Sequence, residues 1–298
     1  MYYRRKILLA LLSVFDGQLT AKQFQKYLFL FTRKQEIKSF DFVPYRYGCF
    51  SFQANQDIAT LAKYGYCTIA ENRKVRFFEL TKDDDFFNTL KPEDRKSLLE
   101  VKAQFGNLRQ SDLIRYTYRQ YPYYAIKSVI AKDLLNSTEL NTIELQKRHY
   151  HEKQLFSIGY EGISLEAYIN KLIINDVNVL CDVRKNAYSQ KYGFSKKTLE
   201  LACKSVDIEY VHIPDLGIIS NKRKELSSQE DYDDLFREYE KTTLKENKSS
   251  LLAIRSLLDK GKRVALTCFE KDPKQCHRTC VANALMQLPK TDYKFKNL

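Results

Sequence analysis

The stretch Val177-Asn178-Val179-Leu180-Cys181-Asp182-Val183 is a short apolar run, rich in β-branched residues, that ends beside an acidic side chain. Three more runs of this kind lie in the same half of the chain: 155–159, 209–213 and 263–269. Segments with helical spacing lie between and after them: 164–174, 196–205, 229–245, 248–259 and 278–288. Because strands that alternate with helices form parallel sheets, this half predicts an α/β Rossmann-like three-layer fold.

The first quarter of the chain has a different pattern. Helical periodicity covers three segments: 4–15, Thr20 to about Phe31, and 50–66. Two β-like runs follow, 67–70 and 75–80, joined by Glu71-Asn72-Arg73-Lys74. This order predicts a mainly α winged helix-turn-helix module whose basic wing tip, with Arg73, Lys74 and Arg76, contacts phosphate. Winged helices also serve as dimerisation or protein-binding modules, so the pattern alone leaves the partner open.

A helical linker region is predicted between the two modules. Asp83-Asp84-Asp85 marks a break, and Lys91-Pro92-Glu93-Asp94 opens a helix. The region is rich in tyrosine: Tyr116, Tyr118, Tyr121, Tyr123 and Tyr124. Such a cluster could stack bases, although it more often forms a packed helical interface. With the polar stretch 146–153 as the second boundary, we expect three parts: 1–82, 83–152 and 153–298.

Charge and composition narrow the classes of function. The chain of 298 residues carries a net charge of +13, and residues 1–82 hold 14 Lys and Arg against 6 Asp and Glu. A basic module favours an anionic partner, nucleic acid before membrane and DNA in the first place, although lysine-rich coding would give the same excess. No stretch approaches eighteen uncharged apolar residues, so no membrane span is expected. Seven scattered cysteines and a start without a cleavable leader predict a cytoplasmic protein.

Unusual polar clusters follow the predicted strands of the α/β half. The first strand runs into Gly159-Tyr160-Glu161-Gly162, the second into Asp182-Val183-Arg184 and the fourth into Cys268-Phe269-Glu270. Cys276-His277-Arg278 opens the last helix. Ligands of open parallel sheets bind beyond the carboxyl ends of the strands. These residues therefore predict one shared polar site.

The same motifs carry a resemblance to a known family. Ser157 to Gly162, Asp182-Val183-Arg184, Leu216-Gly217 and the Cys268-x-Glu270…Cys276-His277-Arg278 ending are similar to domain-of-unknown-function family 488, over about residues 154–288. This resemblance implies an α/β fold and a shared polar site, and it supplies no activity.

A second resemblance concerns the N-terminal part. Asp41-Phe42-Val43-Pro44-Tyr45-Arg46-Tyr47-Gly48, followed by a helix, resembles the winged-helix leader attached to some members of that family. The segment is also loosely similar to the antitoxin-like SocA family, with Cys49 where that pattern usually has proline.

Five residues of the predicted site are suited to an anionic ligand. Arg184 and Arg278 are planar cations that match phosphate or carboxylate. Gly159 and Gly162 would let backbone N–H groups approach the anion, with Tyr160 between them. A small anionic ligand is the simplest prediction from these residue types.

The acidic residues of the site predict proton transfer. Glu161, Asp182 and Glu270 in one pocket would repel one another, raise one pKa and provide a general acid paired with a base. His277 is a further candidate for the catalytic site. A structural ion-pair network of Asp182 and Arg184 explains those two residues without catalysis, and both interpretations stay open at this point.

The cysteines near the last helix allow a thiol or a metal. Cys276, at a helix start beside His277 and Arg278, has the setting of a reactive thiolate, whereas Cys268 at a strand end is typical of a small buried residue. Zinc prefers four tetrahedral ligands. Adjacent Cys276 and His277 would not easily face one ion from a regular helix, so we expect no metal and identify no cofactor.

Taken together, the patterns predict a nucleic-acid-associated enzyme that acts on a nucleotide or nucleic acid. The reaction class would be hydrolysis or transfer at a glycosidic or phosphoester bond. The alternatives are a ligand-sensing DNA-binding regulator without catalysis and an interaction subunit of a larger assembly.

Overall fold

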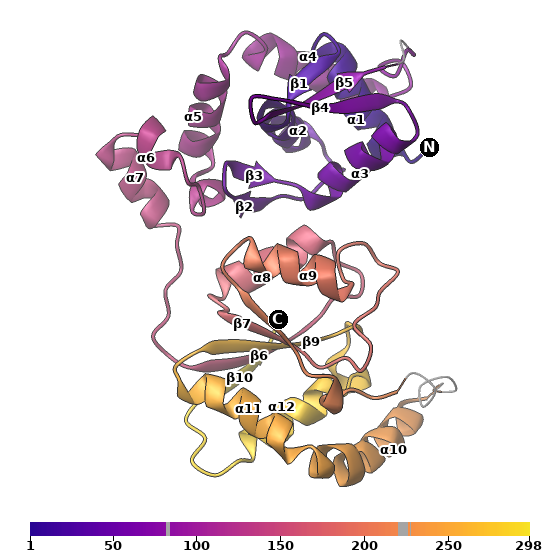
Figure 1. The fold of residues 1–298 in the computed structure, drawn as a ribbon, viewed down its shortest axis with the longest axis vertical. Coiled ribbons are helices and arrows are strands. Elements are labelled where there is room, and N and C mark those ends of the chain that lie inside the picture. Colours follow the sequence, from indigo (N-terminus) through magenta and orange to yellow (C-terminus); the bar gives the residue numbers. More distant parts are fainter. Residues whose placement is uncertain (82–83, 220–225, 227) are drawn as a thin grey trace. The chain divides into compact units, whose positions relative to one another are not determined.

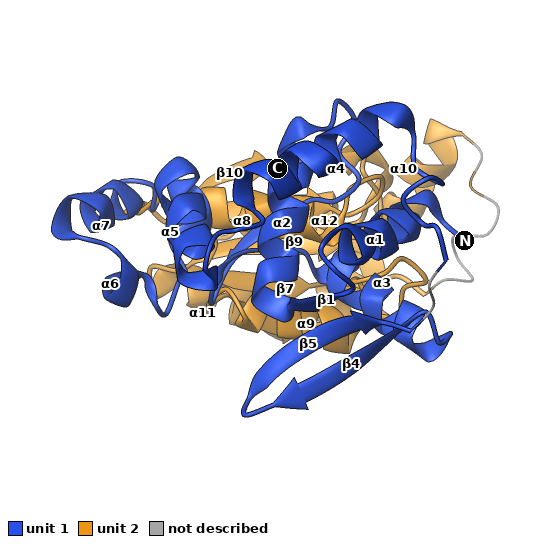
Figure 2. Cartoon of the chain, turned by 90° about the horizontal axis from the view of Figure 1, so that it is seen from above, with its two compact units in different colours: residues 1–147 blue, residues 148–298 orange. Residues whose placement is uncertain are grey.

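The computed structural model describes residues 1–81, 84–219, 226 and 228–298. The chain forms two compact units, residues 1–147 and 148–298 (Figure 2). The boundary predicted between residues 82 and 83, including Asp83, lies outside the described residues. None of the described helices is long and apolar enough to cross a membrane.

The N-terminal unit is helical and carries a small antiparallel sheet (Figure 1). Its first elements are α1 (Tyr3–Val14), β1 (Gln18–Thr20), α2 (Ala21–Lys34), β2 (Val43–Tyr45), β3 (Gly48–Phe50), α3 (Phe52–Lys63), β4 (Cys67–Asn72) and β5 (Val75–Leu80). Strands β1, β5 and β4 pair in that order, and β2 with β3 forms a separate hairpin. Helix α3 begins two residues later than predicted, because the Ser51 hydroxyl caps it by accepting the N–H of Ala54 at 3.2 Å.

The rest of this unit consists of α4 (Pro92–Phe105), α5 (Gln110–Gln120), the 3₁₀ turn η1 (Pro122–Ala125), α6 (Ala131–Leu134) and α7 (Ser137–Glu144). The tyrosines of this region pack inward. Tyr118 is buried, and the rings of Tyr121 and Tyr124 meet Phe29 of α2 edge-on, at centroid distances of 5.0 and 4.8 Å. These three tyrosines form a packed helical interface, the second of the two interpretations that the sequence allowed.

The C-terminal unit is an α/β layered domain around a five-stranded parallel sheet. Its elements are β6 (Gln154–Gly159), α8 (Leu165–Ile174), β7 (Val179–Asp182), α9 (Lys196–Lys204), β8 (Glu209–His212), η2 (Pro214–Leu216), α10 (Gln229–Tyr239), the π turn η4 (Glu240–Leu244), α11 (Lys248–Asp259), β9 (Arg263–Cys268), η5 (Pro273–Gln275), α12 (Arg278–Met286) and β10 (Lys294–Asn297). The strand order is β10-β6-β9-β7-β8. Helices α8 and α9 cover one face, and α10, α11 and α12 cover the other (Figure 1).

The predicted α/β fold is therefore confirmed, with one additional strand. Apolar residues of β6 and β9, such as Leu155 and Leu266, pack against Ile254 of α11 and Val281 of α12. Ser164 begins α8 as expected for a cap, since its hydroxyl accepts the N–H of Ala167 at 3.0 Å. Strand β10 was not predicted, because it is a mostly exposed edge strand with little apolar signal.

Candidate functional site

The sheet order brings three of the predicted strand ends side by side. Strand β9 lies between β6 and β7. Gly159 pairs in register with Cys268, and Asp182 pairs with Thr267. The motifs that follow these three strands therefore emerge at one carboxyl edge of the sheet, where open α/β sheets bind their ligands.

Asp182 and Arg184 bind each other inside this edge. The Nε and Nη2 of Arg184 donate to the two carboxylate oxygens of Asp182 at 2.8 and 2.5 Å, and the two side chains are 6% and 0% exposed. The hydroxyl of Tyr210 donates to the same carboxylate at 2.6 Å. Nη1 of Arg184 donates to the hydroxyl of Tyr160 at 2.7 Å and to the carbonyl of Phe194 at 2.9 Å.

This pair has the geometry of a structural ion-pair network. Burial by itself would lower the pKa of Arg184, but the hydrogen bonds and charge of Asp182 outweigh burial and hold the pKa above its ordinary value. Most N–H groups of this guanidinium already have partners within the protein. The contacts favour the non-catalytic interpretation of Asp182 and Arg184, and a phosphate contact by Arg184 stays a prediction.

Arg278 is also turned into the protein, with a side chain only 1% exposed. Its Nη1 and Nη2 donate to the carbonyls of Glu270 and Lys271 at 2.6 and 3.2 Å, and its Nε donates to the hydroxyl of Ser157 at 3.3 Å. The guanidinium thus fixes the loop that follows β9.

Gly159 and Tyr160 shape the same loop. A Cβ atom on Gly159 would lie 1.9 Å from the carbonyl oxygen of Glu270, so only glycine allows this close approach. The ring of Tyr160 stacks on Phe194 with a centroid distance of 4.3 Å. Gly162 adopts a φ of 77°, which glycine favours, in the turn before α8.

The three predicted acid/base carboxylates have different partners. Asp182 binds Arg184, whereas the exposed Glu161 accepts the backbone N–H of Lys271 at 2.9 Å. Glu270 is half-buried and accepts a hydrogen bond from the thiol of Cys268, with 3.2 Å between Sγ and Oε2. The acid/base pairing expected from crowding of these carboxylates stays a prediction.

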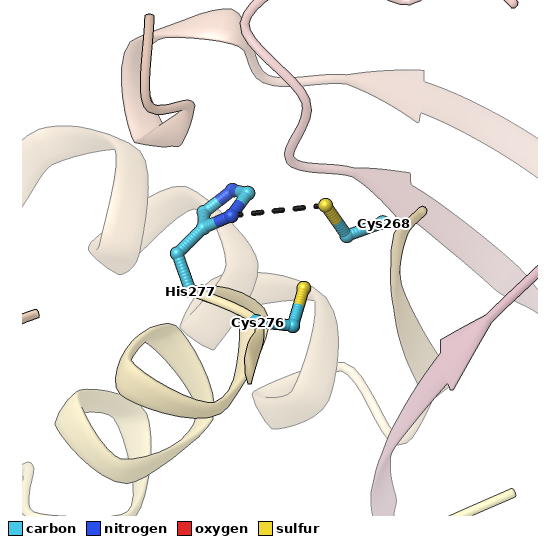
Figure 3. Close-up of side chains that lie close together, drawn as sticks. All are labelled: Cys268, Cys276 and His277. Atoms are coloured by element: carbon cyan, nitrogen blue, oxygen red, sulfur yellow. Dashed lines mark hydrogen bonds between the residues drawn. The ribbon is translucent and has the colours of Figure 1, made fainter. Parts of the chain in front are cut away.

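Cys268, Cys276 and His277 form a buried cluster behind this edge (Figure 3). Their side-chain donor atoms lie within 4.8 Å of one another. The Sγ of Cys268 is 3.7 Å from Nδ1 of His277, and Nε2 of His277 is 2.9 Å from the carbonyl oxygen of Val183. Burial raises the pKa of the Cys276 thiol well above its ordinary value, which opposes the predicted reactive thiolate.

The assumption behind the expected lack of a metal was wrong in one respect. The expectation places Cys276 and His277 on one regular helix, which would point their side chains apart. In the structure Cys276 is extended (φ −135°, ψ 127°) and His277 is helical (φ −59°, ψ −17°). This change of backbone conformation lets two adjacent side chains face one point.

The motif Cys268-x-Glu270…Cys276-His277-Arg278 is thus assembled at one edge of the sheet. Residues 164–285 match the family model Domain of unknown function DUF488. The match confirms the resemblance predicted for the C-terminal half, although it begins after the Gly159–Gly162 motif. No curated protein matches the chain.

Outside the DUF488 match, the N-terminal unit contains a cavity of about 440 Å³. It is lined from α2, the β2–β3 hairpin, the N-terminal part of α3, β5 and its turn, and α5. Its lining includes four basic residues, Lys22, Lys26, Lys74 and Arg76. The aromatic residues are Tyr45, Tyr47, Phe50 and Phe78, and no Asp or Glu is among the described lining residues.

Two lysines of this cavity are held in place by neighbours. Lys26 is 1% exposed and donates to the carbonyl of Cys49 at 3.2 Å, and burial lowers its pKa. The Nζ of Lys22 lies 4.0 Å from the ring centroid of Tyr47. No sequence motif marks these two lysines, and the nearest signal is the 41–48 segment, which carries Tyr45 and Tyr47.

Of the predicted wing-tip residues, Arg73 and Lys74 form the turn between β4 and β5, and Arg76 lies at the start of β5. Arg73, Lys74 and Arg76 are all exposed. Arg73 and Lys74 have φ angles of 47° and 66°, in the left-handed region that side chains other than glycine seldom adopt. Two cations thus occupy positions where a tight hairpin turn favours Asn-Gly.

Proposed function

We propose that the protein binds nucleic acid, DNA in the first place, through a winged helix-turn-helix in its N-terminal unit. The order of elements supports this proposal, since α1, α2 and α3 precede the β4–β5 hairpin and β1 completes the small sheet. In helix-turn-helix proteins the second helix of the pair enters the major groove. Here that helix is α3, and the β4–β5 hairpin is the wing.

The exposed face of α3 has residue types that read base edges. Gln56 is exposed, Asn55 and Thr60 on the same side of the helix are half-buried, and the exposed Lys63 follows at its end. Asn and Gln pair with adenine, while lysine contacts guanine or phosphate. The acidic residue of this helix, Asp57, is buried and bound by Arg4 and Arg5 at 2.6 and 2.7 Å, so its charge is balanced inside the unit.

The cavity beside the wing is the observation that carries the proposal. Cations suit the phosphate backbone, and aromatic rings suit a base or sugar, which is the combination typical of nucleic-acid grooves. The lack of acidic groups among its described lining residues removes the repulsion that an anionic ligand would otherwise meet. This proposal corresponds to the regulator alternative, in which no bond of the ligand is broken.

Salt-dependent binding tests the proposal. We expect the full-length protein to bind a labelled DNA duplex with an affinity that falls as salt rises, and Arg73→Glu/Lys74→Glu/Arg76→Glu to weaken binding and flatten the dependence. The matched control is Lys96→Glu/Lys132→Glu/Lys260→Glu, which changes net charge equally at exposed lysines elsewhere. Equal effects of the two triple variants would contradict a role of the wing, and parallel titrations with RNA and single-stranded DNA identify the preferred form.

The second candidate function is turnover of a nucleotide in the C-terminal unit, and the environment of Lys191 supports this function. Its ammonium donates to the carbonyl of Tyr160 at 2.7 Å, and burial lowers its pKa although the charge of Glu161 opposes this shift. A lysine with a lowered pKa beside a carboxylate suits proton transfer at a sheet edge.

Mass spectrometry of nucleotides, DNA and RNA after incubation with the protein tests this candidate. A mass change that Glu161→Gln and Lys191→Met abolish would support turnover. If all nucleotides, DNA and RNA remained intact after incubation, binding without turnover would be the supported function.

A further inference from the structure

We infer that Cys268, Cys276 and His277 form a binding site for a divalent transition metal, with Zn²⁺ preferred. Two sulfur donors and one imidazole nitrogen lie within 4.8 Å of one another. Zn–S bonds of about 2.3 Å and Zn–N bonds of about 2.0–2.1 Å place two tetrahedral donors about 3.5–3.6 Å apart. The 3.7 Å between Sγ of Cys268 and Nδ1 of His277 is therefore close to one edge of such a tetrahedron (Figure 3).

The orientation of His277 is that of a metal ligand. A carbonyl oxygen only accepts hydrogen bonds, so the 2.9 Å contact with Val183 requires Nε2 to carry the proton. In the neutral ring the lone pair is then on Nδ1, the atom that faces Cys268. Metal-bound histidines commonly donate their other N–H to a backbone carbonyl in this way.

The loop that carries the donors is fixed before any ion binds. Arg278 holds the carbonyls of Glu270 and Lys271, and Gly159 allows the Glu270 carbonyl to pack directly on β6. Asp272 begins the following 3₁₀ turn by accepting the N–H of Lys274 at 2.8 Å. A metal site formed on such a fixed loop loses little conformational entropy on binding.

Burial distinguishes a metal from a catalytic thiol. Cys268, Cys276 and His277 are 1%, 0% and 0% exposed, so a nucleotide or peptide does not reach their sulfur atoms, whereas a single ion is small enough to lie between three donor atoms within 4.8 Å of one another. Two thiolates and an imidazole match the ligand preference of Zn²⁺.

Glu270 is placed to supply the fourth ligand. Its carboxylate Oε2 lies 3.2 Å from Sγ of Cys268. Binding of one M²⁺ ion forms two metal–thiolate bonds, one metal–imidazole bond and one metal–carboxylate bond and releases the two thiol protons to solvent, with no change of oxidation state. The buried guanidinium of Arg278 offsets part of the negative charge that the thiolates bring.

Cobalt titration of the full-length chain tests the site. The protein is reduced, stripped of metal with a chelator and titrated with Co²⁺, whose tetrahedral thiolate complexes absorb strongly in the visible and near ultraviolet. We expect these bands to saturate at one Co²⁺ per chain and to disappear when Zn²⁺ displaces it. Cys268→Ser, Cys276→Ser and His277→Gln should each lower the affinity at least tenfold.

Cys280→Ser is the matched control, because it removes a buried thiol of α12 that is not part of the cluster. It should bind Co²⁺ as the wild type does. Absence of the bands from the wild type, or bands that persist unchanged in Cys268→Ser and Cys276→Ser, would overturn the inference.

Native mass spectrometry of the unmodified chain decides the question even if a variant fails to fold. The expected mass is that of the chain plus one metal ion minus two protons. A chain lighter by two hydrogens and without metal, in which peptide mapping places the disulfide between Cys268 and Cys276, would also overturn the inference.

Discussion

Replacing Arg73 and Lys74 by Asn and Gly tests whether charge at the β4–β5 turn, the tip of the proposed wing, is maintained at the expense of stability. Both residues have positive φ angles in the two-residue turn between β4 and β5. A side chain in the left-handed region costs about 1–2 kcal/mol, and Asn-Gly is the pair that such turns favour. Strained non-glycine residues of this kind are typical of functional positions.

This exchange should stabilise the fold and weaken DNA binding. The relief of strain at residue 74 is partly offset by the entropy that glycine loses on folding, about 0.5–1 kcal/mol. We therefore expect a net stabilisation of about 0.5–1 kcal/mol. Loss of the two proposed phosphate contacts should make the slope of log K against log salt less negative by about 1.8, which corresponds to about 60-fold weaker binding at 0.1 M salt.

Thermal unfolding and fluorescence anisotropy with a labelled DNA duplex measure the two quantities on the same samples. The control Lys96→Gln/Lys132→Gln removes two exposed cations elsewhere in the same unit. A more stable variant with wild-type affinity and slope would refute the phosphate contact. A less stable variant would refute the strain argument.

Three further predictions concern Asp182, Gly159 and Lys26. Asp182→Asn leaves the guanidinium of Arg184 buried without its counter-ion, so urea unfolding should show a loss of about 3–5 kcal/mol; a loss below 1 kcal/mol would contradict the ion-pair network. Gly159→Ala places a Cβ against the backbone carbonyl of Glu270, and we expect about 1–3 kcal/mol of destabilisation together with weaker Co²⁺ binding. Burial lowers the pKa of Lys26 from 10.5, so the folded state binds fewer protons than the unfolded state between the lowered pKa and 10.5, and wild-type stability should rise with pH across that window. Lys26→Met should raise the melting temperature at pH 7 and abolish this rise, and an unchanged pH profile would show that Lys26 is not its source.

The α/β half could be predicted because its signals are local. Runs such as 177–183 and 263–269 combine apolar and β-branched residues, and the buried strands β7 and β9 lie within them. Parallel order then places the residues after each strand at one edge. Strand β10 has no such signal, because Lys294 and Lys296 face outward at the edge of the sheet, and its pairing with β6 arises only from tertiary contacts.

The hydrogen-bond partners of Arg184 and Arg278 could not be predicted from residue type. A guanidinium suits a phosphate and a buried carboxylate equally well, so the partner depends on which group lies nearest in the folded chain. Asp182 precedes Arg184 by two residues at the same strand end and accepts its hydrogen bonds. Arg278 donates instead to the backbone carbonyls of the loop that follows β9. The basic cavity was missed for a related reason, since its lining comes from elements far apart in the sequence.

The inward orientation of Arg278 changes the role that we assign to the Cys-x-Glu…Cys-His-Arg motif. In an anion pocket Arg278 would face outward and the cysteines would be incidental. Instead Arg278 and Gly159 act on the loop backbone, and the loop in turn brings Cys268, Cys276 and His277 to one buried point. The most specific residues of the motif thus divide into donors and the groups that position them, which is the division expected of a metal site with its supporting contacts.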